Sequence, residues 1–265
     1  MRWTIGERSS NLEDRRGERF GGMGFGRLGL GGILVVLVLS LIFKRDFFSL
    51  LSGGSSQAAP AGPVATTPEE EHLVDFVSFV FDTAQSTWTK ILAQRRAQYH
   101  DAKLVLFRDA VESACGFSEA ATGPFYCPGD HKVYIDLGFY DELRRRFGAP
   151  GDFAQAYVLA HEVGHHVQTL LGDTFGGSNR ESVRRELQAD CYAGIWGYYM
   201  AREGVLEPGD VQEGMGAAAA VGDDRLQRMS TGTVSPETFT HGTSQQRVSW
   251  FRRGLDSGRL ENCRT

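Results

Sequence analysis

The chain has 265 residues, 41% of them hydrophobic, and a formal net charge of -5. This length allows one ordinary domain, or one domain with appendages, and the acidic balance gives no reason to expect nucleic acid as a partner. Four cysteines without a CxxC pair exclude a disulfide-stapled miniprotein and argue against a zinc ribbon.

The N-terminal quarter of the chain contains a polar stretch followed by an apolar one. Residues 1–27 are rich in Arg and Gly and have no apolar period, so we expect a disordered, solvated tail. The uncharged run LGLGGILVVLVLSLIF follows at residues 28–43, and the stems of Lys44 and Arg45 extend it to Phe48. Because a spanning helix needs about 20 apolar residues, residues 28–48 predict one transmembrane helix that anchors the protein.

Two other interpretations of this apolar run are weaker. A buried core helix is disfavoured because the flanks are charged and glycine-rich. A cleaved signal peptide stays open, although the small residues suited to cleavage lie well past the apolar run.

The distribution of basic residues predicts an orientation. Arginines at positions 15, 16, 19 and 27 precede the apolar run, and only Lys44 and Arg45 follow it before Lys90. This excess places the N-terminus in the cytoplasm and the main domain outside the cell membrane, in the periplasm or at the cell surface. Residues 49–68, rich in Gly, Ser, Ala and Pro, form a flexible linker, and the domain occupies residues 69–265.

Most of this domain has helical patterns. Ser178 with Glu181, and Asp152 with Gln155, have the spacing of capping boxes, and Gly172 is a natural helix stop. The pattern predicts an α+β fold that is mainly helical with a small β-sheet. The expected strands are 103–107 and 131–137, and the expected helices are 69–96, 138–148, 153–171, 178–202, 208–228 and 243–255.

The helix over 153–171 carries the motif that suggests chemistry, His161-Glu162-Val163-Gly164-His165. Residues four apart on a helix lie on one face, so His161 and His165 can share a Zn²⁺ ion. Glu162 lies beside that face and can act as the base for a zinc-activated water. A chance motif on a solvated helix is disfavoured because the surrounding residues are apolar and Gly164 indicates a close approach.

The next helix supplies the third ligand. Glu186 and Asp190 are four residues apart in RRELQADCYAGIWG, which also carries a strip of small residues suited to close helix packing. We assign Glu186 as ligand and expect Asp190 to accept the free N–H of a ligand histidine. An exposed acidic face is the alternative. His166 points elsewhere on its helix and is expected either to pack or to support a ligand from outside, and not to be a ligand itself.

Hydrolysis of an amide needs a donor for the oxyanion. His241, in the loop FTHGTSQQR, is a candidate, with an ordinary surface histidine as the alternative. A peptide substrate also needs a docking edge, and the strand over 131–137 is either that edge or a core strand. Tyr126, Tyr134 and Tyr157 are lesser candidates for the oxyanion donor.

Four blocks together carry a family resemblance: FYCPGDHKVYIDLGFY, YVLAHEVGHHVQTLLG, RRELQADCYAGIWG and THGTSQQRVSWF. In this order, from about Arg2 to Cys263, they resemble the bacterial neutral zinc metallopeptidase family, a group of membrane-anchored proteins. The resemblance implies a zincin-like catalytic domain with zinc, whose motifs fall on His161, Glu162, His165 and the segment 186–190. It implies no particular substrate.

The cysteines fit an oxidising compartment. Cys115 and Cys127 flank a short Gly/Pro-containing loop, which leaves Cys191 with Cys263. Four cysteines allow three connectivities, so these two disulfides are a hypothesis, and thiolate zinc ligands are the rival.

The sequence therefore favours a membrane-anchored zinc metallopeptidase acting on a peptide or protein, with no prediction of oligomeric state. A non-catalytic zinc-binding scaffold and a zinc hydrolase of other amides or esters remain as alternatives.

Overall fold

The computed structural model describes residues 1–18, 66–119 and 123–265, most of which form one unit made of residues 1–15 and 66–265. Within this unit a four-stranded sheet has the order β1 (Leu12–Asp14), β2 (Lys103–Phe107), β6 (Lys132–Asp136) and β5 (Phe125–Cys127). The first three strands run parallel, and β5 pairs with β6 in the antiparallel sense. A separate hairpin joins β3 (Ala110–Ser113) to β4 (Gly116–Glu119).

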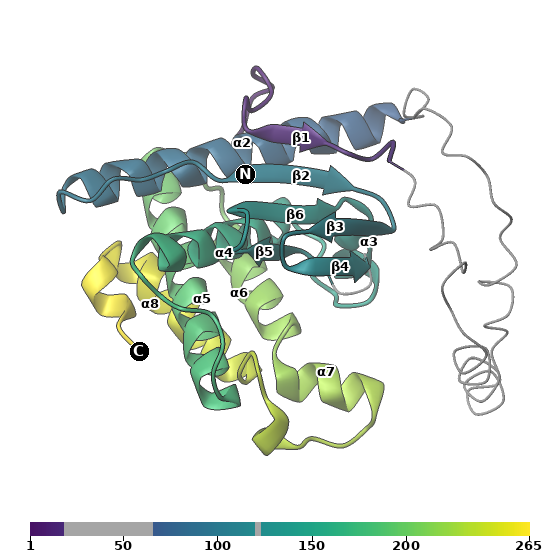
Figure 1. Ribbon diagram of the computed structural model, residues 1–265, viewed down its shortest axis with the longest axis vertical. Coiled ribbons are helices and arrows are strands. Elements are labelled where there is room, and N and C mark those ends of the chain that lie inside the picture. The colour runs from purple at the N-terminus through teal and green to yellow at the C-terminus, as the bar shows by residue number, and fades with distance from the viewer. Residues whose placement is uncertain (19–65, 120–122) are drawn as a thin grey trace, which may run out of the picture. The chain divides into compact units, whose positions relative to one another are not determined.

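The helices confirm the predicted α+β class. They are α2 (Pro68–Ala93), α3 (Gly138–Arg145), α4 (Asp152–Leu170), α5 (Asn179–Arg202), α6 (Asp210–Ala220), α7 (Asp223–Ser230) and α8 (Ser244–Ser257), with short 3₁₀ turns at Pro236–Thr238 and Leu260–Cys263. Helix α4 packs against the sheet and α2 on one side and against α5 and α6 on the other (Figure 1). Almost all of α4 is buried for this reason.

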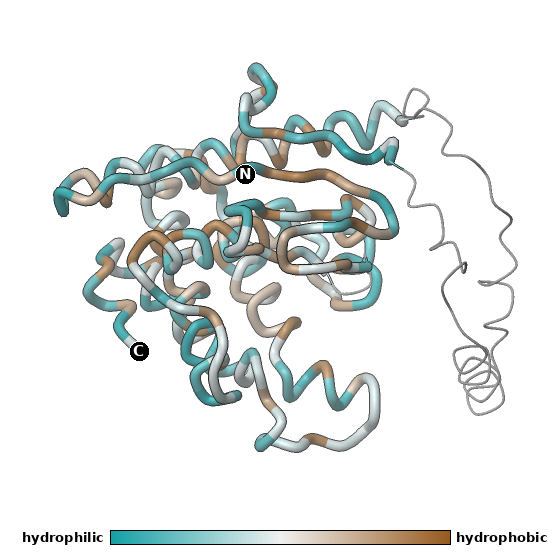
Figure 2. Tube along the Cα trace, viewed as in Figure 1, coloured by the Kyte–Doolittle hydropathy of each residue, from teal (hydrophilic) through white to brown (hydrophobic). Residues whose placement is uncertain are grey.

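The predicted strands are present, but the second one lies in the middle of the sheet. Strand β2 is apolar along its length and buried from Leu104 to Phe107 (Figure 2). Strand β6 lies between β2 and β5, so residues 131–137 form a core strand, which was one of the two alternatives, and the docking-edge alternative is wrong. The edge strand nearest to α4 is β5.

Local capping signals were reliable at one helix start and wrong at another. Ser178 and Glu181 form the predicted capping box of α5, and Gly172 follows the end of α4 with a positive φ of 92°. Helix α4, however, begins after Gly151 with no side-chain cap, because the Asp152 carboxylate instead accepts hydrogen bonds of 2.9 and 3.0 Å from the α-ammonium group of Met1.

The single helix predicted over 208–228 is two helices. The chain turns between α6 and α7 at Gly222, where an added Cβ would lie 2.3 Å from the backbone nitrogen of Ser244. The start of α8 therefore packs against a position that only glycine can occupy, and this contact breaks the helix.

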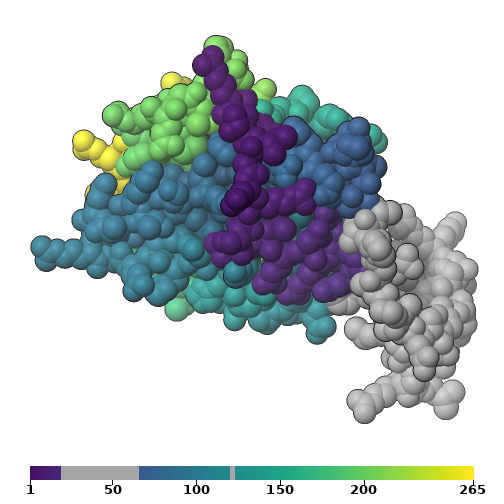
Figure 3. All heavy atoms as spheres, turned by 90° about the horizontal axis from the view of Figure 1, so that it is seen from above, coloured from purple at the N-terminus to yellow at the C-terminus, as the bar shows by residue number. Residues whose placement is uncertain are grey.

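The prediction of a disordered tail is wrong for the first part of residues 1–27. Strand β1 pairs with β2, and the Trp3 ring packs 5.3 Å from that of Phe76 on α2. The N-terminal segment lies across the α2 surface (Figure 3). The sequence did not reveal these contacts because they are made by isolated residues and by a strand of three residues. Such a strand is too short to show a period, and its partner is remote in sequence.

The position of β1 bears on membrane topology. Paired strands lie on the same side of any membrane, so the predicted orientation, with the N-terminus inside and the domain outside, does not agree with the pairing of β1 and β2. The predicted anchor 28–48 and most of the linker 49–68 lie outside the described residues. In the ranges that the structure describes, no helix combines the length and the apolar character needed to cross a membrane.

Candidate metal centre

A close contact between α4 and α5 creates the site. A Cβ added to Gly164 would lie 3.1 Å from the Ala189 carbonyl oxygen and 3.3 Å from Ala189 Cα. Glycine on α4 and alanine on α5 therefore let the two backbones approach, as the small-residue strip predicted. This approach turns the histidine face of α4 toward the acidic face of α5.

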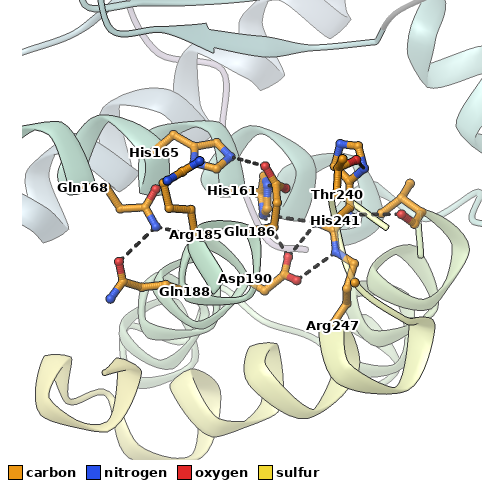
Figure 4. A network of polar contacts seen from close by, with 12 residues as sticks. His161, His165, Gln168, Arg185, Glu186, Gln188, Asp190, Thr240, His241 and Arg247 are labelled. Atoms are coloured by element: carbon orange, nitrogen blue, oxygen red, sulfur yellow. Dashed lines mark hydrogen bonds and ion pairs between the residues drawn. The ribbon is translucent and has the colours of Figure 1, made fainter. Parts of the chain in front are cut away.

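The structure brings together the three residues that the sequence predicts as ligands. His161 Nε2 lies 3.1 Å from Glu186 Oε2, and His165 Nε2 lies 3.3 Å from Glu186 Oε1. One ligand atom from each residue lies within 4.8 Å of the others. The three side chains point toward one another from α4 and α5 (Figure 4).

The outer nitrogens of both histidines are fixed by acceptors. His161 Nδ1 lies 2.8 Å from Asp190 Oδ1, as the sequence predicts for Asp190, and His165 Nδ1 lies 2.8 Å from Gln168 Oε1. The Gln168 amide nitrogen donates to the Arg185 carbonyl at 2.7 Å, so its oxygen faces the ring. Each imidazole is therefore held at Nδ1, which directs Nε2, the nitrogen that would bind a metal, at the cluster.

The charges of the cluster also suit a cation. Burial by itself would raise the pKa of the Glu186 carboxyl, but His165 and His161 hold it well below its usual range. Burial would lower the pKa of His161, yet Asp190 and Glu186 raise it to about 10. The buried carboxylates are thus stabilised by positive charge between them. Two imidazoles with one carboxylate form a donor set suited to Zn²⁺.

Glu162 lies next to this cluster without belonging to it. Its side chain is 8% exposed, and burial raises the pKa of its carboxyl although both neighbouring histidines oppose the shift. None of the described residues forms a hydrogen bond with this carboxylate, so it is available to a molecule in the adjacent cleft.

A cleft of about 630 Å³ opens onto the cluster. His161, Glu162, His165 and Glu186 lie in its lining. Its walls come from β5, α3 and α7, through residues that include Phe125, Tyr126, Phe139, Phe147, Leu226 and Met229. A larger cavity of about 780 Å³, between the N-terminal segment, α2 and α3, contains none of the cluster residues and is not the site.

His241 lines the same cleft from the loop before α8, with 48% of its side chain exposed. Its Nδ1 lies 3.0 Å from Asp223 Oδ1, and its backbone N–H donates to Asp223 Oδ2 at 2.6 Å. Burial would raise the pKa of Asp223, but these bonds from His241 lower it. Asp223 thereby holds the loop and the ring at the cleft wall.

Sequence reasoning missed the roles of Gln168 and Arg247 at this site. Arg247 is 4% exposed and its guanidinium pairs with Asp190. A signal existed, because Arg247, Phe251 and Gly254 recur at helical spacing and all lie on the buried face of α8. For Gln168, the three-residue spacing from His165 on one helix was the available signal.

His166 has the packing role expected for it. Its Nε2 lies 2.6 Å from the His100 carbonyl oxygen and its Nδ1 lies 3.1 Å from the Tyr126 hydroxyl. The ring is fully buried between α4 and the sheet side of the molecule. Both ring nitrogens have hydrogen-bond partners, and through Tyr126 the His166 side chain links α4 to β5.

Both predicted disulfides are present, Cys115–Cys127 and Cys191–Cys263. They use all four cysteines, which removes thiolates from the list of metal ligands. The second bridge fastens the C-terminal turn to α5 directly after Asp190, and so stiffens the part of α5 that faces the site.

Comparisons with known proteins extend over the whole chain. A family model described as "Putative neutral zinc metallopeptidase" matches residues 1–265. The uncharacterized protein YpfJ of Escherichia coli (strain K12) is 46% identical over 284 residues, which covers 100% of this chain and 98% of that relative. The uncharacterized protein Rv2575 of Mycobacterium tuberculosis (strain H37Rv) is 46% identical over 177 residues, or 60% of each chain. No solved structure matches the chain.

Proposed function

Because the chain belongs to the family described as "Putative neutral zinc metallopeptidase", we propose that it is a zinc-dependent peptidase with Glu162 as its general base. The observation that carries this proposal is the buried cluster of His161, His165 and Glu186 with Glu162 beside it. A structural zinc site closes with four protein ligands, whereas a catalytic site has three and leaves a position open to the cleft.

The chemistry divides between the ion and the chain. Zinc, when bound, supplies a Lewis acid that polarises a carbonyl group and acidifies water. The Glu162 carboxylate takes a proton from the attacking water and passes it to the leaving nitrogen. Its burial supports this role because burial raises the pKa of the carboxyl, which makes it a better proton acceptor.

The cleft wall supports a peptide as the substrate. Strand β5 pairs with β6 along one edge, and none of the described strands pairs with its other edge. Phe125 and Tyr126 of β5 line the cleft beside the cluster. An extended peptide can add to such an edge through main-chain hydrogen bonds, which recognise a backbone and not a particular side chain.

His241 is the proposed donor to the oxyanion. Its Nδ1 lies 3.0 Å from Asp223 Oδ1, so Nε2 is the ring nitrogen that can face a substrate in the cleft.

The place of action is proposed from the disulfides. Two bridges are typical of a compartment outside the cytoplasm, so we propose that the metal-binding unit works there. The apolar run at residues 28–48 is then proposed to hold the protein at the membrane without a single crossing, because β1 and β2 pair and lie on one side.

The test is the substitution Glu162→Gln. We expect one bound zinc per chain, as in the wild type, and at least a ~100-fold loss of peptide hydrolysis, since general-base catalysis contributes about 10²–10⁴-fold. Zinc is measured by elemental analysis and turnover with a mixed peptide library. Glu203→Gln, an exposed carboxylate remote from the cleft, is the control and should keep full activity. Undiminished turnover in Glu162→Gln would exclude the mechanism, and stoichiometric zinc without any turnover in the wild type would favour a binding protein.

A further inference from the structure

The helix α8 crosses α5 at a distance that only glycine permits. A Cβ on Gly254 of α8 would lie 1.9 Å from the Cys191 carbonyl oxygen, and a Cβ on Gly194 of α5 would lie 2.0 Å from the Phe251 carbonyl oxygen. Two helices with glycine at the crossing bring the neighbouring turns into direct contact. On α5 the residue one turn before Gly194 is Asp190, and on α8 the buried residue one turn before Phe251 is Arg247.

Arg247 and Asp190 form a two-pronged ion pair. Arg247 Nε donates to Asp190 Oδ2 at 2.8 Å, and Nη2 donates to Asp190 Oδ1 at 2.8 Å. The side chain of Asp190 is fully buried and that of Arg247 is 5% exposed. A buried ion pair is weak evidence for stability, because removing both charges from water costs as much as their attraction returns. Stability alone therefore does not explain why this ion pair is buried here.

Asp190 also accepts hydrogen bonds from two side chains of α4. Asp190 Oδ1 accepts from His161 Nδ1 at 2.8 Å and also from the Tyr157 hydroxyl. Arg247 Nη2 lies 3.3 Å from His161 Nδ1 and 3.2 Å from the Tyr157 oxygen. With both carboxylate oxygens engaged by one planar guanidinium, Asp190 has a single orientation, and His161 can satisfy Nδ1 only by turning Nε2 toward Glu186.

The two histidines differ in this respect. His165 is held by Gln168, a neutral residue on its own helix, whereas His161 is held by a charged pair contributed by α5 and α8. Arg247 lines the cleft, but its guanidinium is engaged by the chain itself, because Nε and Nη2 donate to Asp190 and Nη1 donates to the Val221 carbonyl at 3.2 Å.

We propose that Arg247 is a positioning residue of the metal centre: it locks Asp190 so that His161 presents Nε2 to the ion, which makes α8 a required part of the site. The inference rests on the proposed function for the identity of the metal as zinc. It assigns α8 a task that neither the metal-binding motif nor the third-ligand helix performs.

The test is Arg247→Met, which keeps the length of the side chain and removes the guanidinium. Loss of an outer partner of a metal ligand costs about 10–100-fold in metal affinity, so we expect zinc to bind about that much more weakly. Zinc affinity is measured by competition with a chromophoric chelator, and the geometry of the centre by the visible absorption spectrum of the Co²⁺-loaded protein, which should change. Arg252→Met on the exposed side of the same helix is the matched control and should keep both.

A second variant covers the case in which Arg247→Met does not fold, since it leaves Asp190 buried without a counter-charge. Arg247→Lys keeps a positive charge but cannot hold both oxygens in one plane, and it should bind zinc with an affinity below that of the wild type and shift the Co²⁺ spectrum. Wild-type affinity and spectrum in a folded Arg247→Met, or in Arg247→Lys if the first variant is unfolded, would overturn the proposal. Neither readout involves peptide hydrolysis, so the outcome is independent of the Glu162→Gln result.

Discussion

The two sides of helix α4 hold buried histidines that have opposite uses. On the α5 side, His165 turns Nε2 toward Glu186 and donates from Nδ1 to Gln168. On the sheet side, its neighbour His166 has one nitrogen 2.6 Å from a backbone carbonyl and the other 3.1 Å from the Tyr126 hydroxyl. Since both rings are buried, burial does not mark a ligand. What distinguishes them is whether the second nitrogen faces the cluster of His161 and Glu186 or a packing partner.

The charges around the two sides reinforce the difference. Asp190 and Glu186 form hydrogen bonds with His161, and together they raise the pKa of this histidine to about 10. Burial lowers the pKa of His166 to about 4, against a hydrogen bond to the His100 carbonyl that acts in the other direction. One side of the helix is thus built to hold positive charge, and the other is built to stay neutral.

The largest expected effects, which test this difference between the two sides of α4, come from substituting one histidine at a time. We expect His165→Ala to weaken zinc binding by more than the about 10–100-fold that loss of an outer partner costs. His166→Ala should keep zinc but lose about 2–4 kcal/mol of unfolding free energy, because it leaves a cavity and two unpaired polar groups. Zinc affinity by chelator competition and urea unfolding of the metal-free proteins separate the two outcomes. Loss of zinc in a His166→Ala protein of unchanged stability would contradict the division of roles.

The second prediction concerns pH. The pKa of His166 is about 4 in the folded protein against 6.5 for a free histidine. Between these values the unfolded chain binds a proton that the folded chain does not, so the unfolding free energy falls as the pH falls. From pH 7 to pH 4 this site should contribute a loss of about 3 kcal/mol. We expect the metal-free wild type to lose that much more stability over this range than metal-free His166→Phe. Parallel stability curves would show that His166 is not held neutral.

The smallest expected effect concerns only the side of α4 that faces α5 and the candidate metal centre. Gln168→Met removes the acceptor of His165 Nδ1 while keeping the size of the side chain, so the ring can turn. We expect zinc affinity to fall by about 10-fold, at the lower end of the range for outer partners, because the acceptor is neutral. Gln155→Met, elsewhere on α4, should bind zinc as the wild type does. Equal affinity in the two variants would mean that packing alone orients His165.

Much of the site was readable from the sequence because its spacings are those of single helices. His161 and His165 share a face whatever the rest of the molecule does, and so do Glu186 and Asp190. Gly164 and the small residues of α5 signalled the approach of two backbones, which the structure contains. The disulfides followed from loop length and elimination, and both were correct.

The errors have one cause, which is contact between segments remote in sequence. Strand β1 has no pattern of its own and forms because β2 offers an edge. Asp152 has the spacing of a cap but binds the N-terminal ammonium, and Gly222 ends a helix because α8 packs against it. None of these partners can be recognised from local sequence.

The residues of the candidate metal centre and the helices that carry them were thus predictable from the sequence alone, because periodicity and chemistry are local properties. Three features required the tertiary structure: which strand forms the edge beside the cleft, which groups His166 packs against, and the place of Arg247 beside His161 and Asp190. Those choices depend on which distant surfaces fit together, and packing across the chain is what a one-dimensional pattern does not contain.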